Sequence, residues 1–507
     1  MRATVYPISI SFALGIFIAY MLIPTWAVWW VIAMALALCC MVMPITFSKS
    51  TFLYRHNAIS LITLLPIVAS GAVAALTQAN LNEVDYPKHA GEYDIVIMSE
   101  PSMHNKHITA EALIASGAYK GKSVRTSFSR NIFGTTLPCP GDGYRIYCQL
   151  KRPTDFSSSN FSFARYMQVR NIPFVAYVGN GCCKSKAITY DSLPDLQRSR
   201  LGAMALRSAA ADVYRRQGLE GDALATLSAM TLGDKSMLSK DVKEYYATAG
   251  TSHLLALSGT HLTIVFFLVS LVFGRYSRRL PCAATILLIT WTYVIIVGMP
   301  PSLLRAAIML TVFSITNISN RGRSQLNSLS IAALIMMIAN PAVVFDVGFQ
   351  LSVSAVFAIV AIYPRLKVED NLNDTLPLCL NNVKRWTFNY LFFNLTIFLL
   401  TTPLVAYYFG HIPLYFLLSN LIAIPAISII LYLSAAVLLF SYIPAVSQIC
   451  SWCLQTSING FNDLLMSIAT LPNSYISIPK MSNGTLIETY IILIILFSLI
   501  MHISKKL

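Results

Sequence analysis

Twelve apolar stretches run through the chain, most of them long enough to form a helix across a bilayer. Of its 507 residues, 56% are hydrophobic and 12% are charged, whereas about a quarter of a soluble domain is charged. Crossing a membrane takes about 20 apolar residues. We therefore predict a polytopic α-helical membrane protein with eleven or twelve spans. The stretches are 5–23, 26–47, 58–77, 254–273, 283–297, 303–318, 329–338, 347–362, 387–409, 414–440, 446–470 and 486–503. The stretch 446–470 is polar enough to lie at the membrane interface instead.

Basic residues gather in alternate loops between these stretches. Arginines and lysines occur at 49–55, 275–279, 321–323 and 365–385, and the intervening turns are nearly uncharged. Cytoplasmic loops of membrane proteins carry an excess of such residues. With residue 2 inside, every basic loop lies inside, residues 80–250 lie outside the cytoplasm, and the basic tail 504–507 is cytoplasmic.

A polar region, residues 80–200, separates the third apolar stretch from the fourth. Short alternating runs bounded by Gly, Pro and Asn predict five strands, at 93–98, 107–116, 122–129, 143–150 and 174–178. Five strands in one small unit favour a compact all-β barrel, with an OB-like fold as the natural candidate. The region holds 15 Lys and Arg against 10 Asp and Glu, a mild excess that fits either a solvated surface or contact with nucleic acid.

A basic amphipathic helix follows at 201–217. It carries Arg207, Arg215 and Arg216, and we predict that it lies on the outer membrane surface. These patterns divide the chain into a three-span segment (1–79), an outer OB-like domain (80–200), interfacial helices (201–250), a second transmembrane domain (251–503) and the tail (504–507).

Polar residues interrupt the apolar run at 249–265. His253, Ser258, Gly259 and His261 lie there, and hydrocarbon offers them no hydrogen-bond partner, so they should face protein or water. On one continuous helix the two histidines would stand about 12 Å apart along the axis, too far to share a metal ion, so no metal site is predicted. Gly250 and Gly259 favour a broken helix. The polar groups either line a translocation path or hydrogen bond neighbouring helices.

A second polar cluster lies at 298–306. Pro300 and Pro301 predict a helix start, and Ser302 is its candidate cap. Arg305 follows one turn into an apolar stretch, where an unpaired arginine costs several kcal/mol. It therefore needs a carboxylate, an anionic substrate or a position from which it can reach the outer interface.

A third cluster, at 340–355, places Asp346, Gln350 and Ser354 four residues apart, so they share one helical face. Asp346 is the predicted ion-pair partner of Arg305.

Prolines interrupt the last long apolar tract. The interruptions are Thr402–Pro403, His411–Pro413, Asn420 and Pro425, and prolines at membrane depth occur both in kinked structural helices and in the broken helices of transporters. The predicted lining or gating residues of the chain are His253, Ser258, Gly259, His261, Pro300, Pro301, Ser302, Arg305, Asp346, Gln350, Ser354, Pro403, Asn420 and Pro425.

No enzymatic motif is found. The sequence has no P-loop, no G-x-S-x-G and no H-E-x-x-H, so we expect neither catalysis nor a cofactor. In the polar region, Cys139 or Cys148 could pair with Cys182 or Cys183 in a disulfide, and a reduced state is the other alternative.

Four runs of the chain resemble, in order and spacing, the ComEC family of competence proteins. They are SHLLALSGTHLTIV, PPSLLRAAIM, NPAVVFDVGFQLSVSA and TPLVAYYFG through SNLIAIP. The outer region adds PGDGYRIYCQLKRP and FSFARYMQVRNIPFVAYV, similar to the family's amino-terminal domain. Each motif alone is weak, but four in register are specific.

This resemblance implies a channel of the bacterial inner membrane that imports single-stranded DNA into the cytoplasm during natural transformation. It implies as partners a cytoplasmic helicase-like ATPase and a periplasmic DNA receptor, with a homo-oligomer also considered. Many members continue into a metallo-β-lactamase-like domain, for which the residues before Leu507 show no H-x-H-x-D-H cluster. We therefore expect a short form whose nuclease is another protein. The alternatives are a secondary transporter of a small anionic solute and a membrane scaffold that transports nothing.

Overall fold

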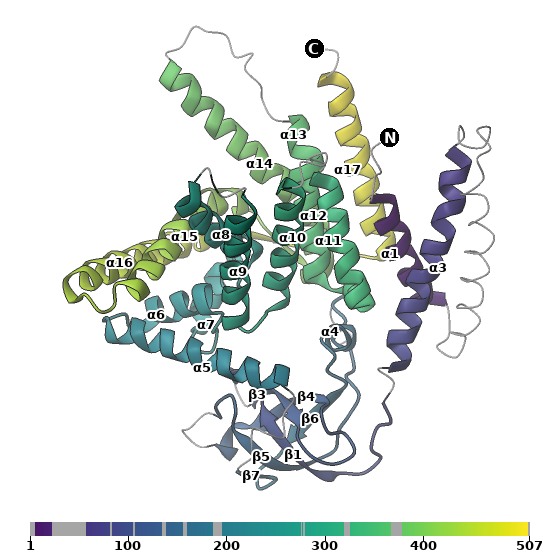
Figure 1. Ribbon diagram of the computed structural model, residues 1–507, viewed down its shortest axis with the longest axis vertical. Coiled ribbons are helices and arrows are strands. Elements are labelled where there is room, and N and C mark those ends of the chain that lie inside the picture. The colour runs from purple at the N-terminus through teal and green to yellow at the C-terminus, as the bar shows by residue number, and fades with distance from the viewer. Residues whose placement is uncertain are drawn as a thin grey trace.

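A small β-domain lies below a set of helices in the computed structural model (Figure 1). The structure describes residues 6–22, 57–81, 84–104, 107–133, 138–155, 160–185, 195–274, 276, 279–318, 325–366 and 378–504. The stretch predicted at 26–47 and tail residues 505–507 lie outside these ranges. The beginning of α14, the short helix α13 and the end of α17 lie at the top of Figure 1, opposite the sheet.

The β-domain is a seven-stranded sheet. Its strands are β1 (Gly91–Ile97), β2 (Ser102–His104), β3 (His107–Ile114), β4 (Ser123–Ser129), β5 (Gly143–Cys148), β6 (Phe174–Val178) and β7 (Cys183–Ser185). The order is β6-β4-β3-β1-β5-β7, with β2 paired to β3, and β4 and β6 run parallel. A bridge from Lys151 to Val175 joins the segment after β5 back to β6. The five predicted strands are confirmed, and the short β2 and β7 are additional.

Alternation explains why these strands form a sheet around one core. Every second residue of β3 and β4 is buried, as expected of strands with one face inward. Ile95, Ile108, Phe128 and Phe174 are almost fully buried in this core. The helix α4 (Phe163–Val169) precedes β6 and begins at Ser162, whose hydroxyl accepts from the backbone N–H of Arg165.

Three helices connect the β-domain to the apolar part: α5 (Asp195–Arg216), α6 (Gly221–Leu227) and α7 (Lys240–Thr248), with the π-turn η5 (Ser228–Leu232) between α6 and α7. Leu201 and Met204 of α5 pack against Val96 and Met98 of the β-domain, and α5 also contacts α9. Arg207 of this helix is buried, so this arginine does not face a membrane, and the location of the helix on the outer membrane surface stays a prediction.

Apolar helices form the rest of the structure. They are α1 (Tyr6–Leu22), α3 (Asn57–Leu81), α8 (Gly259–Phe273), α9 (Leu280–Ile296), α10 (Pro301–Ile318), α11 (Gln325–Ala339), α12 (Val347–Phe357), α13 (Tyr363–Leu366), α14 (Leu378–Phe409), α15 (Phe416–Leu439), α16 (Pro444–Ala469) and α17 (Asn483–Ser504), with the single turns η7 (Pro341–Phe345) and η8 (Ala358–Ile362). Among the described residues, 347–366, 387–409 and 416–439 are helical, long and apolar enough to cross a membrane, and seven other apolar helices are shorter. A mostly helical chain with membrane-compatible helices and a small sheet is therefore confirmed.

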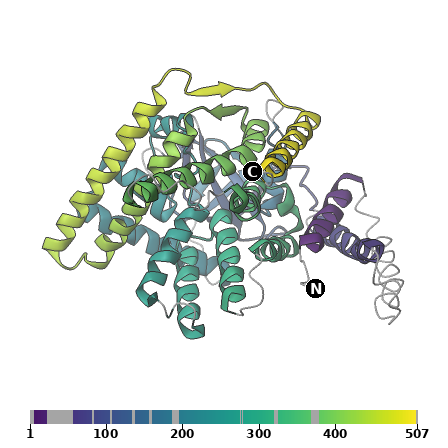
Figure 2. The same cartoon turned by 90° about the horizontal axis from the view of Figure 1, so that it is seen from above.

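Glycines allow α1 and α3 to cross closely. A Cβ on Gly15 would lie 1.8 Å from the Val68 carbonyl oxygen, and one on Gly71 would lie 2.2 Å from that of Phe12. Small residues at such crossings let helix backbones approach. Figure 2 shows this pair, in purple, at one edge of the molecule and α16, in yellow-green, at the opposite edge.

Pro403 and Pro425 lie inside the continuous helices α14 and α15. The helices are therefore not broken at these two prolines, and the tract is interrupted between them at β8 (His411–Pro413), one of the predicted positions, which pairs with β9 (Tyr475–Ser477). Near Pro403, the hydroxyls of Thr401 and Thr402 donate to carbonyls one turn earlier. The carbonyl that Pro403 leaves without its helical N–H donor is that of Leu399, and apolar helices tolerate such a proline where neighbouring groups serve the freed carbonyl.

The helix α16 turns its polar side inward. Ser447, Ser451 and Asn462 are buried, whereas Ile449 and Trp452 are exposed. The Asn462 Oδ1 atom accepts a hydrogen bond of 2.8 Å from the Tyr246 hydroxyl of α7. Ser447, Ser451 and Asn462 therefore face the protein, whereas Gln448, Asn459 and Asp463 of the same helix are exposed.

Candidate functional site at the start of α8, α10 and α12

An irregular segment, residues 250–258, separates α7 from α8. Gly250 has φ +77°, and a Cβ there would lie 2.7 Å from Pro413 Cγ, so both its conformation and its surroundings require glycine. The predicted break in this run is confirmed. The placement of His253 and His261 on one helix is wrong, because His253 lies in the irregular segment, exposed, with its ring centroid 6.3 Å from that of Phe416.

His261 is locked at the start of α8. Its Nδ1 atom lies 3.2 Å from the backbone N of Ser258, which donates to it, and 2.7 Å from the Ser258 hydroxyl oxygen. Because Nδ1 accepts a backbone N–H, the neutral ring carries its proton on Nε2. That atom is buried and has no hydrogen-bond partner within the described part of the chain. His261 therefore presents an unused donor next to the exposed Thr260 and the half-buried Ser258.

The start of α10 packs on the start of α8. A Cβ on Gly259 would lie 3.3 Å from Ala306 Cβ, so the two helices nearly touch there. Pro301 is the first residue of α10, as predicted, with Pro300 just before it. Ser302 does not act as the helix cap: it lies inside the first turn, and its hydroxyl donates to the Leu257 carbonyl oxygen in the irregular segment.

The predicted ion pair between Arg305 and Asp346 is present. Arg305 Nη1 lies 3.1 Å from Asp346 Oδ2, with 9% and 15% of the two side chains exposed. The same carboxylate oxygen accepts from the backbone N–H of Phe349 at 2.9 Å and so caps α12. A Cβ on Gly348 would lie 2.7 Å from Arg305 Nη2, so glycine gives the guanidinium room. A carboxylate at a helix start is favoured by the positive end of the helix dipole.

The polar face of α12 continues from this pair. Gln350 Nε2 donates to the Val344 carbonyl oxygen at 3.0 Å, and Gln350 Oε1 accepts from the Tyr408 hydroxyl of α14 at 2.9 Å. Ser354, half-buried, lies one turn farther along the helix. Gln350 thus joins α12, η7 and α14, a contact that the sequence did not indicate because Tyr408 lies in a distant apolar run.

Arg165 brings the β-domain to this site. It belongs to α4, and its guanidinium carbon lies 4.6 Å from the ring centroid of Phe345 in η7, one residue before Asp346. A cation over an aromatic face gains about 0.5–2 kcal/mol. The sequence offered no signal for this contact beyond an arginine in the FSFARYM run.

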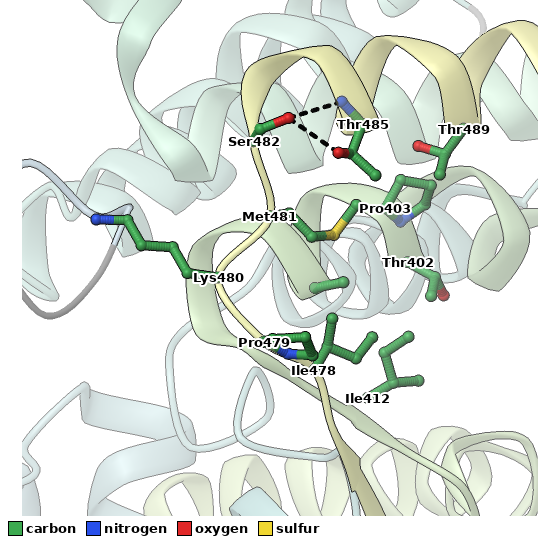
Figure 3. A pocket seen from close by; sticks show the side chains of 11 residues that line it. Thr402, Pro403, Ile412, Ile478, Pro479, Lys480, Met481, Ser482, Thr485 and Thr489 are labelled. Carbon is green, nitrogen blue, oxygen red and sulfur yellow. Dashed lines mark hydrogen bonds between the residues drawn. The ribbon is translucent and has the colours of Figure 1, made fainter.

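The remaining predicted residues lie elsewhere. Asn420 is buried in α15, and Pro425 is exposed on the same helix. Pro403 lines a cavity of about 530 Å³ between α14, the β8–β9 ribbon and α17. Figure 3 shows Pro403, Met481 and Ile412 around this space, with Lys480 extending away from it. The cavity therefore lies apart from the cluster of Ser258, Ser302 and Arg305.

Of the four cysteines of the β-domain, Cys139 is exposed, Cys148 is buried, and Cys182 and Cys183 are half-buried. Burial raises the pKa of Cys148 to about 12 and that of Cys183 to about 11, with the neighbouring Cys182 adding to both shifts. The disulfide, with the reduced state as its alternative, stays a prediction. Within the described ranges, no group of three or more His, Cys, Asp or Glu is arranged to hold a metal ion.

Comparison with known proteins shows the family of this chain. Residues 230–502, which contain α8 to α16, the whole helical part of the site and most of α17, match the family model described as Competence protein. The chain belongs to the Competence protein family. This confirms the resemblance that its motifs carry. ComE operon protein 3 of Bacillus subtilis (strain 168) is 30% identical to this family member over 147 residues, which make up 28% of this chain and 18% of that protein. No solved structure matches the chain.

Proposed function

We propose that this protein is a channel of the bacterial inner membrane that imports single-stranded DNA into the cytoplasm during natural transformation. The observation that carries the proposal is the Arg305–Asp346 pair at the adjoining starts of α10 and α12, within the region that matches the competence family. The family membership and the apolar helices support a membrane role in competence. The passage of a strand is our inference.

The site has the chemistry that a polyanion requires. The Asp346 carboxylate binds Arg305 and also caps α12 through the Phe349 N–H. A phosphodiester can therefore replace this carboxylate both at the guanidinium and at the helix N-terminus. His261 adds an unused N–H donor next to the hydroxyls of Ser258 and Thr260. Backbone that is not helical, such as 250–258, is tolerated at membrane depth where it faces protein or a watery cavity.

The β-domain is proposed to meet the strand first. Its strand order, with parallel β4 and β6 and the bridge from Lys151 to Val175, supports an OB-type barrel. Such domains bind single strands through basic grooves and aromatic faces. Arg165 extends from this domain to Phe345 beside the helical site, which makes it the natural first contact for a phosphate group.

Partners follow from the proposed transport. The sequence contains no P-loop. We therefore propose that a cytoplasmic helicase-like ATPase drives the transport and that a periplasmic receptor supplies the DNA. The protein itself is proposed to be non-catalytic and multi-pass, with residues 80–250 outside the cytoplasm, and a homo-oligomer is one assembly to test.

The test is uptake of marked DNA by cells that carry Arg305→Gln in place of the native residue, with protein amounts matched by immunoblot. We expect transformation to fall at least tenfold. Arg365→Gln, which removes an exposed arginine at the far end of the bundle, is the matched control and should transform normally. Normal transformation with Arg305→Gln would contradict the proposal. Normal transformation with a lost flux of small anions in vesicles would instead favour a solute transporter.

A further inference from the structure

One arginine of the β-domain lies over an aromatic ring of the helical part and is bound by little else. The guanidinium carbon of Arg165 is 4.6 Å from the ring centroid of Phe345, and within the described part of the chain this guanidinium has no ion pair or hydrogen bond. Arg170, five residues later, is instead held by Glu111 at 2.5 Å and by the Tyr166 hydroxyl at 3.0 Å. A ring alone binds a cation more weakly than charge-assisted hydrogen bonds do. Arg165 is therefore the arginine of α4 that can leave its place.

The ring of Phe345 is positioned by α1, whatever Arg165 does. The Tyr20 ring stands edge-on to it, with 5.2 Å between centroids and 73° between planes, and the Phe17 ring lies 6.1 Å away at 32°. The Tyr20 hydroxyl is buried and has no hydrogen-bond partner among the described residues. A buried polar group without a partner is rare in a folded protein and calls for an explanation, such as a missing ligand.

The contact between α4 and η7 is also fixed without Arg165. Figure 1 shows α4 above the sheet and below α11. Asn340, just before η7, donates from Nδ2 to the Val169 carbonyl oxygen at the end of α4 at 2.8 Å. Its Oδ1 atom accepts from Gln78 of α3 at 2.8 Å and from the backbone N–H of Ala342 at 3.1 Å. Asn340 thus joins α3, α4 and η7, so the guanidinium of Arg165 can swing off the ring while the β-domain stays docked.

The position of this ring suits a nucleotide. Phe345 directly precedes Asp346, so the two Cα atoms are about 3.8 Å apart, and Asp346 is the carboxylate that a phosphodiester replaces in the proposed function. A nucleotide carries a phosphate and a base on one sugar. Its phosphate binds a guanidinium more strongly than a ring does, and its base gains about fivefold to 150-fold in affinity by stacking on an aromatic side chain. Exchange of Arg165 for a base on Phe345 is therefore favourable for both side chains.

We propose that Phe345 is a stacking platform for an unpaired base of the incoming strand, and that Arg165 covers this ring until a phosphate draws the guanidinium away. The inference rests on the proposed function and names what the site selects. The bases of a duplex are enclosed in its stack and cannot reach a side chain without being turned out, and a small anion has no base. The platform therefore distinguishes a single strand from both.

Binding of two oligonucleotides to the full chain in nanodiscs tests the platform. One is a fluorescent oligothymidine, and the other has the same length and charge but no bases; anisotropy gives both affinities. We expect the wild type to prefer the oligothymidine by at least about fivefold. Phe345→Leu should lower this preference by at least about fivefold, because the added affinity comes from the ring. Phe345→Tyr keeps a ring and should keep the preference.

The arginine has a separate signature. Arg165→Gln should weaken the binding of both oligonucleotides alike and leave the preference intact. The slope of log affinity against log salt should fall by about 0.7, the value for one phosphate contact on a single strand. Phe357→Leu is the matched control, since it removes an exposed phenylalanine at the other end of α12, and it should behave as the wild type.

The outcomes separate this inference from the proposed function. Equal affinity of the wild type for the two oligonucleotides would overturn the platform and leave strand transport standing, as would a folded Phe345→Leu protein with the wild-type preference. If neither oligonucleotide binds, both proposals fail. If Phe345→Leu does not fold, an oligonucleotide that contains iodouracil is photo-cross-linked to the wild type instead. A cross-link mapped to Phe345 by mass spectrometry would support the platform, and cross-links confined to other residues would overturn it.

Discussion

Neutralising one member of the Arg305–Asp346 pair should cost more stability than neutralising both. Removing one partner of a buried ion pair typically costs about 3–5 kcal/mol, because a charge is left without compensation. Arg305→Gln leaves a carboxylate that still accepts the Phe349 N–H at the start of α12, so its cost should lie near the lower value. Asp346→Asn leaves a buried guanidinium whose Nε has no partner among the described residues, so its cost should lie near the upper one.

The double variant Arg305→Gln/Asp346→Asn leaves no charge behind. Two amides of similar size can hydrogen bond, and the introduced asparagine can still cap α12. We expect this variant to be more stable than Asp346→Asn alone, with an interaction energy of at least about 2 kcal/mol between the two sites.

Unfolding of the purified protein in mixed micelles by a denaturing detergent, followed by circular dichroism, gives the three free energies. Arg365→Gln, which alters an exposed arginine, should change stability by less than about 0.5 kcal/mol. Additive costs of the two single substitutions would refute the reasoning, since they would mean that the charges do not depend on each other.

Two further predictions concern single positions. Gly348→Ala should lower the free energy of unfolding by about 1–3 kcal/mol, because the added carbon would lie 2.7 Å from Arg305 Nη2. Gly460→Ala, where a Cβ would have nothing within 4 Å, should be neutral or stabilising in the same unfolding assay. Equal effects of the two substitutions would contradict this steric account. At pH 8, a charged maleimide should modify the exposed Cys139 readily and the buried Cys148 far more slowly. The pKa of Cys148 is raised from 9.0 to about 12, which lowers its thiolate fraction about a thousandfold. Equal modification rates of the two thiols, followed by mass spectrometry of the folded protein, would count against the buried position of Cys148.

Local patterns predicted the parts of the structure that depend on local rules. The five strands followed from alternation and turn residues, and the break before α8 followed from polar residues in an apolar run. The pair of Arg305 and Asp346 could be predicted across 41 residues because an arginine in an apolar helix must find an anion. In each of these three cases the alternative structure would cost enough free energy for the residues themselves to decide between the two.

The sequence could not predict contacts that arise only when separate elements dock. Arg207 is an ordinary basic residue of an amphipathic helix until the β-domain covers it. Its ion-pair partner Glu100 lies 107 positions earlier in the chain, in a run without an unusual pattern. Of the predicted interruptions, His411–Pro413 is the break, whereas Pro403 and Pro425 lie inside continuous helices, because proline is compatible with a long apolar helix when neighbouring groups serve its freed carbonyl groups.

The central claim is that the polar starts of α8, α10 and α12 border a hydrated path, and thiol accessibility measures this directly. Ser258, Ser302 and Gln350 would each be replaced by cysteine in a background without native cysteines, and a membrane-impermeant reagent would be added to intact spheroplasts. Ile429, an exposed apolar residue of α15, serves as the lipid-facing control. The account predicts that the three polar positions react, that Ile429→Cys does not, and that added single-stranded DNA slows the reaction. Three positions as unreactive as the control would contradict it.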